Sequence, residues 1–572
     1  MSDTPSDASP RPRRPFIRGL PLVAPLRLGR PSDTWFKPAL SVVAASAVPH
    51  LTLLALGRLD LVMYTMAGSF CALYGHGLPY ARRARTVAGV VLSMAAGLAA
   101  AMVTASLTHS TAVLVAVGAL LAAAQKVACD AVRIGPPGPV ILTFVSSAAL
   151  FAPQRLDQVP AHLALTLAAG AVAWLVCVGP ALIRREGPER RAVARALEAA
   201  ADRVAEPGPR TRHTAAAAVH AAWQCLLASG RPTPVRRSLE RLVVHAEAAG
   251  ACAHPDPDRL RAWAALTRAR GPVPEPPPAP GTAAELYGID AERAALRASG
   301  GRRAARRTLL RSLGPGSHLL PVAARTLIGC ALAGYLCAAL GVGRPYWAIV
   351  TAASLYQANT TLTWNRTLQR TVGNLLGVLV FAAVLPLSRT GPLALVLCCL
   401  FFSFAAEALI TRNYWLGSVA VTPMALLVLE FGGAHPAGEL VGDRVLDTVL
   451  GALAGFLAAA LVTNRRAAGR VERALEAAAQ ARTEAERALG HPHAERAQAR
   501  RALTARLVEL REAADIAAGE WWQRALPEQR LLAAERAGHR TLAATAQRQG
   551  PPVRAPETRR GAVAPAPANG AA

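Results

Sequence analysis

Long apolar runs separated by short polar segments make up most of this chain. Only a helix satisfies its own backbone in hydrocarbon, and crossing it takes about twenty apolar residues. This criterion predicts six spans in the first half, near 38–57, 61–79, 87–107, 112–129, 140–152 and 162–183. Six more are predicted near 319–340, 346–357, 371–387, 392–410, 413–429 and 445–462. The fifth and eighth spans are short, and the fifth follows a Gly/Pro-rich segment that predicts a broken or tilted helix.

The two groups of six spans have the pattern of internal repeats. The segment Arg85 to Gly89 (RTVAG) matches Arg370 to Gly373 (RTVG), each expected to open the third span of its half. Six spans return the chain to the same side, so the repeats are parallel. The predicted fold is an all-α integral membrane protein of two parallel six-helix transmembrane repeats, with a cytoplasmic helical domain after each.

Composition shifts predict the domain boundaries. Arg and Glu at helical spacing indicate exposed helices between and after the halves, and a Pro/Ala-rich end indicates disorder. The expected parts are a basic tail (1–37), the first transmembrane half (38–184), a helical domain (185–318) with a Pro-rich linker (271–281), the second transmembrane half (319–463), a helical domain (464–549) and a disordered tail (550–572).

Basic residues predict the orientation. Arginines cluster before the first span, after the sixth span and before the seventh. Cytoplasmic flanks of membrane proteins collect Lys and Arg, so both termini are expected in the cytoplasm. No small-residue cleavage site follows a short apolar core near the start. We expect a multi-pass protein of the inner (plasma) membrane.

Composition narrows the class of protein. The chain of 572 residues is 52% hydrophobic and 17% charged, with a formal net charge of +27. Because Arg alternates with Glu at helical spacing, this charge indicates solvated cytoplasmic helices, and no nucleic-acid partner is expected. The lipid bilayer is the expected partner, and a homo-oligomer is compatible with the sequence. No metal spacing, phosphate-binding loop or nucleophile elbow is present, so we expect no cofactor and no enzyme.

Ionisable residues inside the spans are candidates for function, because they are costly in hydrocarbon. Glu407 lies in an otherwise apolar stretch, where it either pairs with Arg412 or Arg325 or couples transport to protons or substrate. Asp447, three residues after Arg444, is either a helix-start carboxylate favoured by the dipole or a second coupling candidate. Lys126 and Asp130 are expected to form a local ion pair.

Two glycine pairs occur at four-residue spacing in the second half: Gly373 with Gly377, and Gly451 with Gly455. This spacing places each pair on one helical face, where helices can approach closely in lipid. We therefore predict that these glycines pack helices together.

The second half resembles the fusaric acid resistance (FUSC) family of aromatic acid exporters. The resemblance rests on Tyr346, Trp347, Thr351, Arg366, Arg370, Gly373, Gly377, Asn413, Tyr414, Thr422 and Pro423, followed by Arg444, Asp447, Thr448 and Gly451. Asn374 stands where the family usually has Thr. The resemblance implies an exporter of aromatic carboxylates and related toxic acids, driven by the proton gradient.

An aromatic carboxylate needs an apolar slot for its ring and cationic donors for its charge. Arg325, Arg366, Arg370 and Arg412 are candidate donors, and the alternative for each is topology anchoring. Export of a small organic anion is the expected function. A passive anion channel, or a membrane scaffold whose cytoplasmic helices bind partners, are the alternatives.

Overall fold

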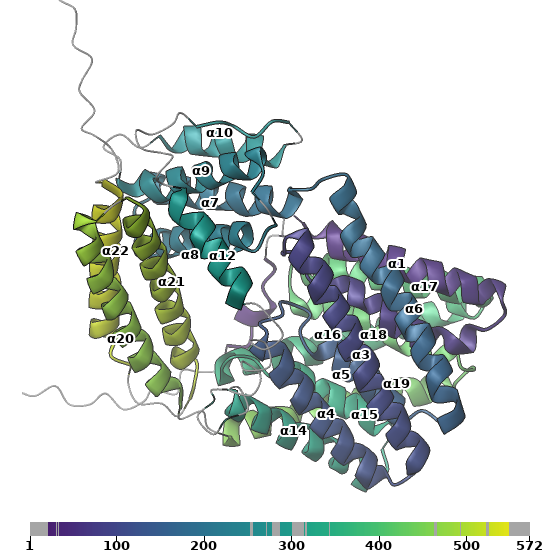
Figure 1. Cartoon of the computed structure of the whole chain (residues 1–572). Coiled ribbons are helices and arrows are strands. Elements are labelled where there is room, and N and C mark those ends of the chain that lie inside the picture. Colours follow the sequence, from purple (N-terminus) through teal and green to yellow (C-terminus); the bar gives the residue numbers. More distant parts are fainter. Residues whose placement is uncertain are drawn as a thin grey trace, which may run out of the picture.

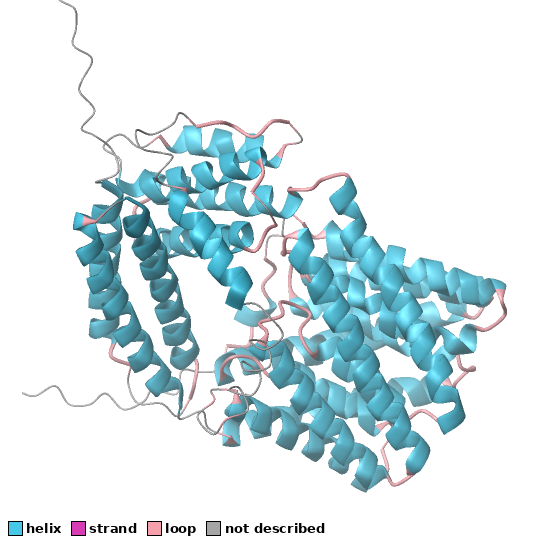
Figure 2. Ribbon diagram, viewed as in Figure 1, coloured by secondary structure: helices cyan, strands magenta, loops and turns pink. Residues whose placement is uncertain are grey.

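Helices make up all the regular structure that the computed structural model describes (Figure 2). It describes residues 21–547 except 30, 32–33, 231, 252–255, 270, 277–285, 300–313, 315–316, 318, 343, 463–465, 492 and 522–525. The predicted disordered tail, most of the basic tail and part of the Pro-rich linker lie outside this range.

The helices form two bodies that lie side by side (Figure 1). The membrane body consists of α1 Phe36–Ala55, α2 Val62–Ser69, α3 Tyr80–Leu107, α4 Thr111–Ala131, α5 Val140–Leu150, α6 Val159–Val178, α14 Leu320–Ala339, α15 Pro345–Leu355, α16 Thr360–Ser388, α17 Pro392–Ile410, α18 Tyr414–Glu430 and α19 Ala437–Leu461. The charged body consists of α7 Gly187–Ala205, α8 Pro209–Leu227, α9 Pro234–Ala248, α10 Pro257–Arg268, α12 Tyr287–Ser299, α20 Arg466–Arg487, α21 His493–Ala518 and α22 Glu528–Gln547. We call the end of the membrane body that faces the charged body proximal, and the other end distal.

Each of the twelve predicted spans contains a helix of the membrane body, but the lengths differ from the prediction. Eight are long and apolar enough to cross a membrane: α1, α3, α4, α6, α14, α16, α17 and α19. The others are shorter, and α5 and α15 have 11 residues each. Eleven residues extend about 16 Å, roughly half of the hydrocarbon core. The short fifth and eighth spans of the prediction are thus confirmed.

Three helices begin before their predicted start. Helix α3 begins at Tyr80 instead of near 87, and α16 begins at Thr360 instead of near 371. Helix α19 begins at Ala437 instead of near 445. A search for apolar runs misses these first turns because they carry polar side chains. Arg83 and Arg370 belong to these turns and are only 4% exposed each, so protein and not water surrounds them.

The two groups of six helices share one order of long and short elements, and they pack in corresponding ways. In each group the second helix packs on the sixth and the third packs on the fifth and sixth. Between groups, α1 packs on α17 and α14 packs on α4. The short helices α2, α5, α15 and α18 meet at the centre of the membrane body.

The predicted register between the groups is wrong by two residues. Arg85 is exposed and Arg370 is buried, so these positions differ in environment. The buried faces of α3 and α16 match when Arg83 is placed opposite Arg370, which also pairs Val87 with Asn374. This register follows from which residues of each helix are buried, and the sequence alone does not show that.

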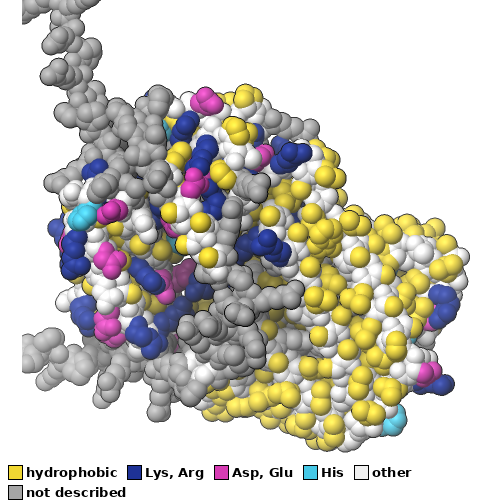
Figure 3. Space-filling view, viewed as in Figure 1, with side chains coloured by type: hydrophobic (Ala, Val, Ile, Leu, Met, Phe, Trp, Pro, Cys, Tyr) yellow, Lys and Arg dark blue, Asp and Glu magenta, His cyan; other side chains and the backbone are white. Residues whose placement is uncertain are grey.

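Apolar side chains cover the visible surface of the membrane body (Figure 3). Exposed residues such as Leu92, Leu379, Phe401 and Leu453 are 63–66% exposed. Charged side chains gather on the charged body and at the distal end (Figure 3). An apolar belt between two polar zones is the surface that a bilayer requires.

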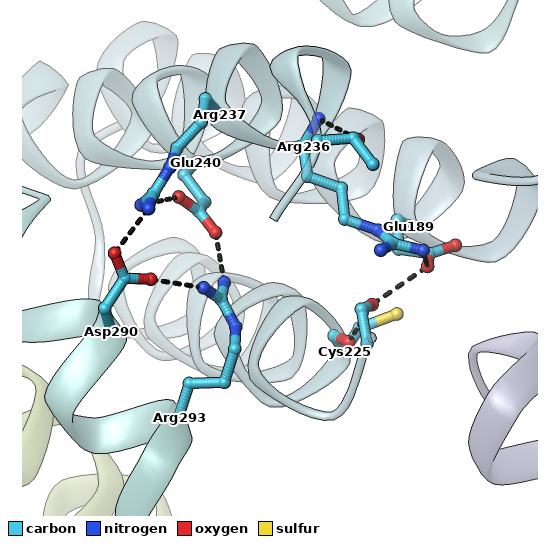
Figure 4. Close-up of polar contacts among 9 residues, drawn as sticks. Glu189, Cys225, Arg236, Arg237, Glu240, Asp290 and Arg293 are labelled. Atoms are coloured by element: carbon cyan, nitrogen blue, oxygen red, sulfur yellow. Dashed lines mark hydrogen bonds and ion pairs between the residues drawn. The ribbon is translucent and has the colours of Figure 1, made fainter. Parts of the chain in front are cut away.

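Buried ion pairs hold the charged body together. Arg293 on α12 pairs with Glu240 on α9, and both side chains are at most 2% exposed (Figure 4). On α7, Glu189 lies 3.6 Å from Arg236 and accepts a hydrogen bond of 2.9 Å from Ser229. Burial raises the pKa of Glu189 despite these partners.

The segments after the two transmembrane halves form one charged body, where separate domains had been expected. Arg500 of α21 pairs with Glu247 of α9 at 2.5 Å, and Arg501 of α21 pairs with Glu292 of α12 at 2.8 Å. Helix α21 also packs on α8. The C-terminal helices are therefore fixed to the helices that follow the first half.

Candidate functional site

Glycines bring four helices of the second half, α15, α16, α18 and α19, into close contact. A Cβ atom at Gly373 would lie 2.5 Å from the carbonyl oxygen of Trp415, and one at Gly377 would lie 2.6 Å from the Cβ of Thr422. On α19, a Cβ at Gly451 would lie 2.6 Å from the carbonyl oxygen of Ala348. These contacts confirm that the predicted glycines pack helices.

Two arginines meet one tyrosine near the proximal end of this group. The guanidinium of Arg366 lies over the ring of Tyr414, 3.7 Å from its centroid. One turn along α16, Nη1 of Arg370 donates to the Tyr414 hydroxyl at 3.1 Å. Neither arginine has a carboxylate partner within 4 Å among the described residues. The cation–π contact and one hydrogen bond leave the two positive charges largely uncompensated.

Three polar side chains, Asn374, Thr422 and Thr448, form a hydrogen-bonded group further along the same helices. Asn374, which is fully buried, donates to the Thr448 hydroxyl at 3.1 Å and accepts from the Thr422 hydroxyl at 3.0 Å. One residue after Thr422, Pro423 has no N–H for the carbonyl of Val419 one turn back. Asn374 thus links α16, α18 and α19.

Arg444 and Asp447 lie on α19, closer to the distal end than Thr448. Arg444 is 1% exposed, and its guanidinium lies over the Trp347 ring at 3.9 Å from the centroid. Asp447 is fully buried, and its Oδ1 accepts a weak hydrogen bond from Sγ of Cys337 at 3.4 Å. Because α19 begins at Ala437, Asp447 lies well inside the helix. The helix-start interpretation of Asp447 is therefore wrong.

These side chains lie on α16 and on the two helices that pack against it, α18 and α19, and together we call them the polar seam. We define it as Arg366, Arg370, Asn374, Tyr414, Thr422, Arg444, Asp447 and Thr448. Several buried polar atoms on or beside it have no hydrogen-bond partner in the described structure: Nε of Arg370, Nε, Nη1 and Nη2 of Arg444, Oδ2 of Asp447, Oγ1 of Thr351 and Oγ of Ser418. Buried polar groups are normally satisfied, so these atoms indicate a place for water or a polar ligand.

The first half has no equivalent series of charges. Val87 of α3 occupies the position that matches Asn374, and Arg83 donates to the carbonyls of Gly75, His76, Leu78 and Cys177 at 2.7–3.2 Å. At the distal end, Tyr64 stacks on His162 with ring centroids 3.7 Å apart. Arg83 is thus saturated by backbone carbonyls, and the seam is confined to the second half.

An apolar cavity of about 30 Å³ lies beside the seam at the centre of the membrane body. Its aromatic lining comes from Phe70, Phe144, Tyr346 and Trp347. The Trp347 ring lies 5.4 Å from that of Phe144 and 5.0 Å from that of Tyr346. This volume holds about one water molecule, so a larger ligand requires the four short helices to move apart.

Residues 21–29, which we call the N-terminal strap, lie across the proximal ends of α16 and α18. Side chains of Gln369, Asn413 and Trp415 donate to strap carbonyls at Pro25 and Leu26, at 2.8, 2.9 and 3.0 Å. Asn413 also caps α18 by accepting from the Trp415 backbone N–H at 3.3 Å. The motif residue Asn413 therefore holds the strap beside Tyr414.

Three further predicted residues lie away from the seam. Arg325 pairs with Glu520 after α21, and Arg412 is exposed in the turn between α17 and α18. Glu407 on α17 is partly buried and has no ion pair in the described part of the chain. Pairing of Glu407 with Arg412 or Arg325 is therefore wrong. The predicted pair of Lys126 and Asp130 is confirmed at 3.0 Å.

Sequence reasoning missed Arg444 and Asn374 as parts of a site. Arg444 enters the sequence prediction only through the family resemblance and as the residue three positions before Asp447. Helical spacing from Gly451 gives a usable signal, because Arg444 and Asp447 precede it by seven and four residues and share its face. Asn374 is visible as the one polar residue between Gly373 and Gly377.

Comparisons with known proteins agree with this location. Residues 329–458 match the family model described as fusaric acid resistance protein-like, which confirms the resemblance for this region. The chain is 32% identical over 130 residues to the uncharacterized membrane protein YvaC of Bacillus subtilis (strain 168). That alignment covers 22% of this chain and 20% of the relative's length. No solved structure matches the chain. The protein is a membrane protein with a FUSC-like region that contains every residue of the seam.

Proposed function

We propose that this protein exports small organic anions, in particular aromatic carboxylates, along the polar seam of its second half. The observation that carries the proposal is a series of arginines, the partly buried Arg366 and the buried Arg370 and Arg444, without a carboxylate partner within 4 Å in the described structure. A desolvated guanidinium binds a carboxylate through charge-assisted hydrogen bonds. The transport involves no covalent chemistry.

The proposed orientation places the charged body and both termini in the cytoplasm of a plasma-membrane protein. Four distal arginines lie near acids: Arg58 with Asp60, Arg155 with Asp157, Arg344 with Asp443 and Arg389 with Glu430, at 2.9–3.9 Å. The proximal residues Arg82, Arg85, Arg133 and Arg412 have no such pair among the described side chains. The arginines without acidic partners thus lie at the proximal end, and the positive-inside rule places such an excess of positive charge on the cytoplasmic side.

The two groups of six helices are proposed to be parallel repeats about an axis along the membrane normal. The shared order of lengths and the matched contacts of α1 with α17 and α14 with α4 support this arrangement. The central cavity lies where the short helices of both repeats meet. Movement of one repeat against the other would widen it for a substrate.

Two carboxyl groups are proposed to couple transport to protons, Glu407 and Asp447. Asp447 lies on the seam, and Glu407 lies on α17 outside it. A passive anion channel is the second candidate, because a series of arginines without carboxylate partners also suits passive conduction. Voltage-driven flux that persists after the proton gradient collapses would favour the channel.

Proteoliposomes containing the full chain test the proposal. They are loaded with radiolabelled benzoate, and exchange against external aromatic carboxylates or neutral amides is followed. We expect exchange with carboxylates that saturates with concentration, and none with amides. Equal exchange with both, or none above empty vesicles, would contradict the proposal.

A further inference from the structure

Arg444 stands apart from the other deeply buried arginines of the membrane body. Arg325, also 1% exposed, is saturated by the Glu520 carboxylate and by the carbonyl of Val462 at 2.8 Å. Arg83 is saturated by the backbone carbonyls of Gly75, His76, Leu78 and Cys177. All three guanidinium nitrogens of Arg444 lack a hydrogen-bond partner in the described structure, and the guanidinium lies over the Trp347 ring. Such a group is costly unless an anion satisfies it.

Asp447 is one turn away on the same face but does not neutralise Arg444 as an ion pair. No oxygen of Asp447 lies within 4 Å of the Arg444 guanidinium, and Oδ2 has no partner in the described structure. Besides Arg444, the charged or titratable groups facing Asp447 are Cys337 of α14, Arg344 and Tyr346 at the start of α15, and Asp443 of α19, while Arg370 of α16 and Tyr414 of α18 face Arg444. Arg444 and Asp447 thus lie one turn apart on α19, and neither has an ion-pair partner in the described structure.

We propose that Arg444, stacked on Trp347, binds the carboxylate of the transported anion, and that protonation of Asp447 strengthens this binding. The inference rests on the proposed function and assigns its internal binding point. The apolar part of the ligand lies against Trp347 and extends towards the central cavity, which Phe144 and Tyr346 also line.

Charge balance gives the direction of the pH effect. With Asp447 ionised, Arg444 and Asp447 together are neutral, and a bound carboxylate leaves one uncompensated negative charge. Protonation of Asp447 makes the occupied site neutral again. Unit charges a few ångströms apart interact strongly at low dielectric, so a proton and an anion bind together. A neutral Asn at position 447 mimics the protonated state.

Isothermal titration calorimetry of the full chain in lipid nanodiscs tests this, with benzoate as ligand and benzamide as the neutral control. Benzoate stays ionised from about pH 5.5 to about pH 8. We expect wild-type binding to weaken as the pH rises, and Asp447→Asn to bind on the order of tenfold tighter at pH 8 with little pH dependence. Asp60→Asn, the same change at an exposed distal carboxylate, should bind like the wild type.

Arg444→Met separates a binding role from a structural one. The variant should lose benzoate binding and keep or raise its thermal midpoint, because it removes a buried charge that has no protein partner. Benzoate binding that survives in Arg444→Met, or unchanged pH dependence in Asp447→Asn, would overturn this inference and leave the proposed function standing. Absence of benzoate binding in the wild type would contradict both.

Discussion

Arg325 and Glu520 form a bidentate ion pair across 195 positions of sequence, with Nη1–Oε1 at 3.1 Å and Nη2–Oε2 at 2.9 Å. Thr360 at the start of α16 donates to the same carboxylate at 2.8 Å. The pair therefore fixes the segment after α21 to the proximal ends of α14 and α16. It joins the charged body to the half of the membrane body that contains the seam.

Breaking this pair should destabilise the protein strongly. Arg325→Met leaves the Glu520 carboxylate buried without its cation, which costs about 3–5 kcal/mol. Thermal unfolding in detergent should show a lower midpoint, and the double variant Arg325→Met/Glu520→Leu should recover much of the loss. A single variant as stable as the wild type would contradict the role of this pair.

Small residues are required where α16 meets α18. Gly373→Leu or Gly377→Leu should abolish detergent-stable protein, and Gly373→Ala should cost about 1–3 kcal/mol because its Cβ would lie too near the Trp415 carbonyl. Gly89→Ala is the matched control, since a Cβ there meets no atom within 4 Å. Size-exclusion profiles and thermal midpoints measure both effects. Equal stability of the two alanine variants would argue against the close contact.

Cysteine labelling tests the orientation. In a Cys-depleted background, Gly271→Cys on the charged body and Gly391→Cys at the distal end place thiols in open space. An impermeant maleimide added to intact cells should label position 391 only. Labelling of position 271 under these conditions would exclude a cytoplasmic charged body.

Acid should loosen α22. His539 faces Arg203, Arg212 and His213, and burial together with these charges lowers its pKa from the ordinary 6.5 to about 4. Because the pKa of His539 is lower when α22 is docked than when it is undocked, protonation of His539 favours the undocked helix. The stabilisation is complete above about pH 6.5 and declines as the pH falls towards 4. Hydrogen exchange of 528–547, corrected for intrinsic rates, should therefore increase from pH 7 to pH 5. His539→Gln should reduce this increase, whereas His491→Gln, at an exposed turn, should retain it.

Glu407→Gln separates coupling from structure. Because Glu407 has no ion pair in the described structure, the variant should fold and reach the membrane normally. If Glu407 couples transport to protons as proposed, efflux at matched protein levels should lose its pH dependence. Unchanged pH dependence would remove Glu407 from the mechanism and leave Asp447 as the coupling carboxyl.

The helical architecture could be predicted because apolar length is a local property of the sequence. The twelve helices of the membrane body, the glycine contacts and the pair of Lys126 with Asp130 all follow from spacing within one segment. The partner of Arg325 could not be predicted, because Glu520 lies in a different body. The burial of Arg444 could not be predicted, because its helix extends two turns beyond the predicted start near 445 and buries the side chain.

Benzoate transport by Arg370→Gln and Arg85→Gln proteoliposomes tests the central claim most directly. Both arginines lie near the proximal end of the third helix of their half, but Arg370 is buried on the seam and Arg85 is exposed. At equal reconstituted protein, we expect Arg370→Gln to lower the transport rate at least tenfold and Arg85→Gln to retain the wild-type rate. Wild-type transport by Arg370→Gln, or equal losses in both variants, would contradict passage of the anion along the seam.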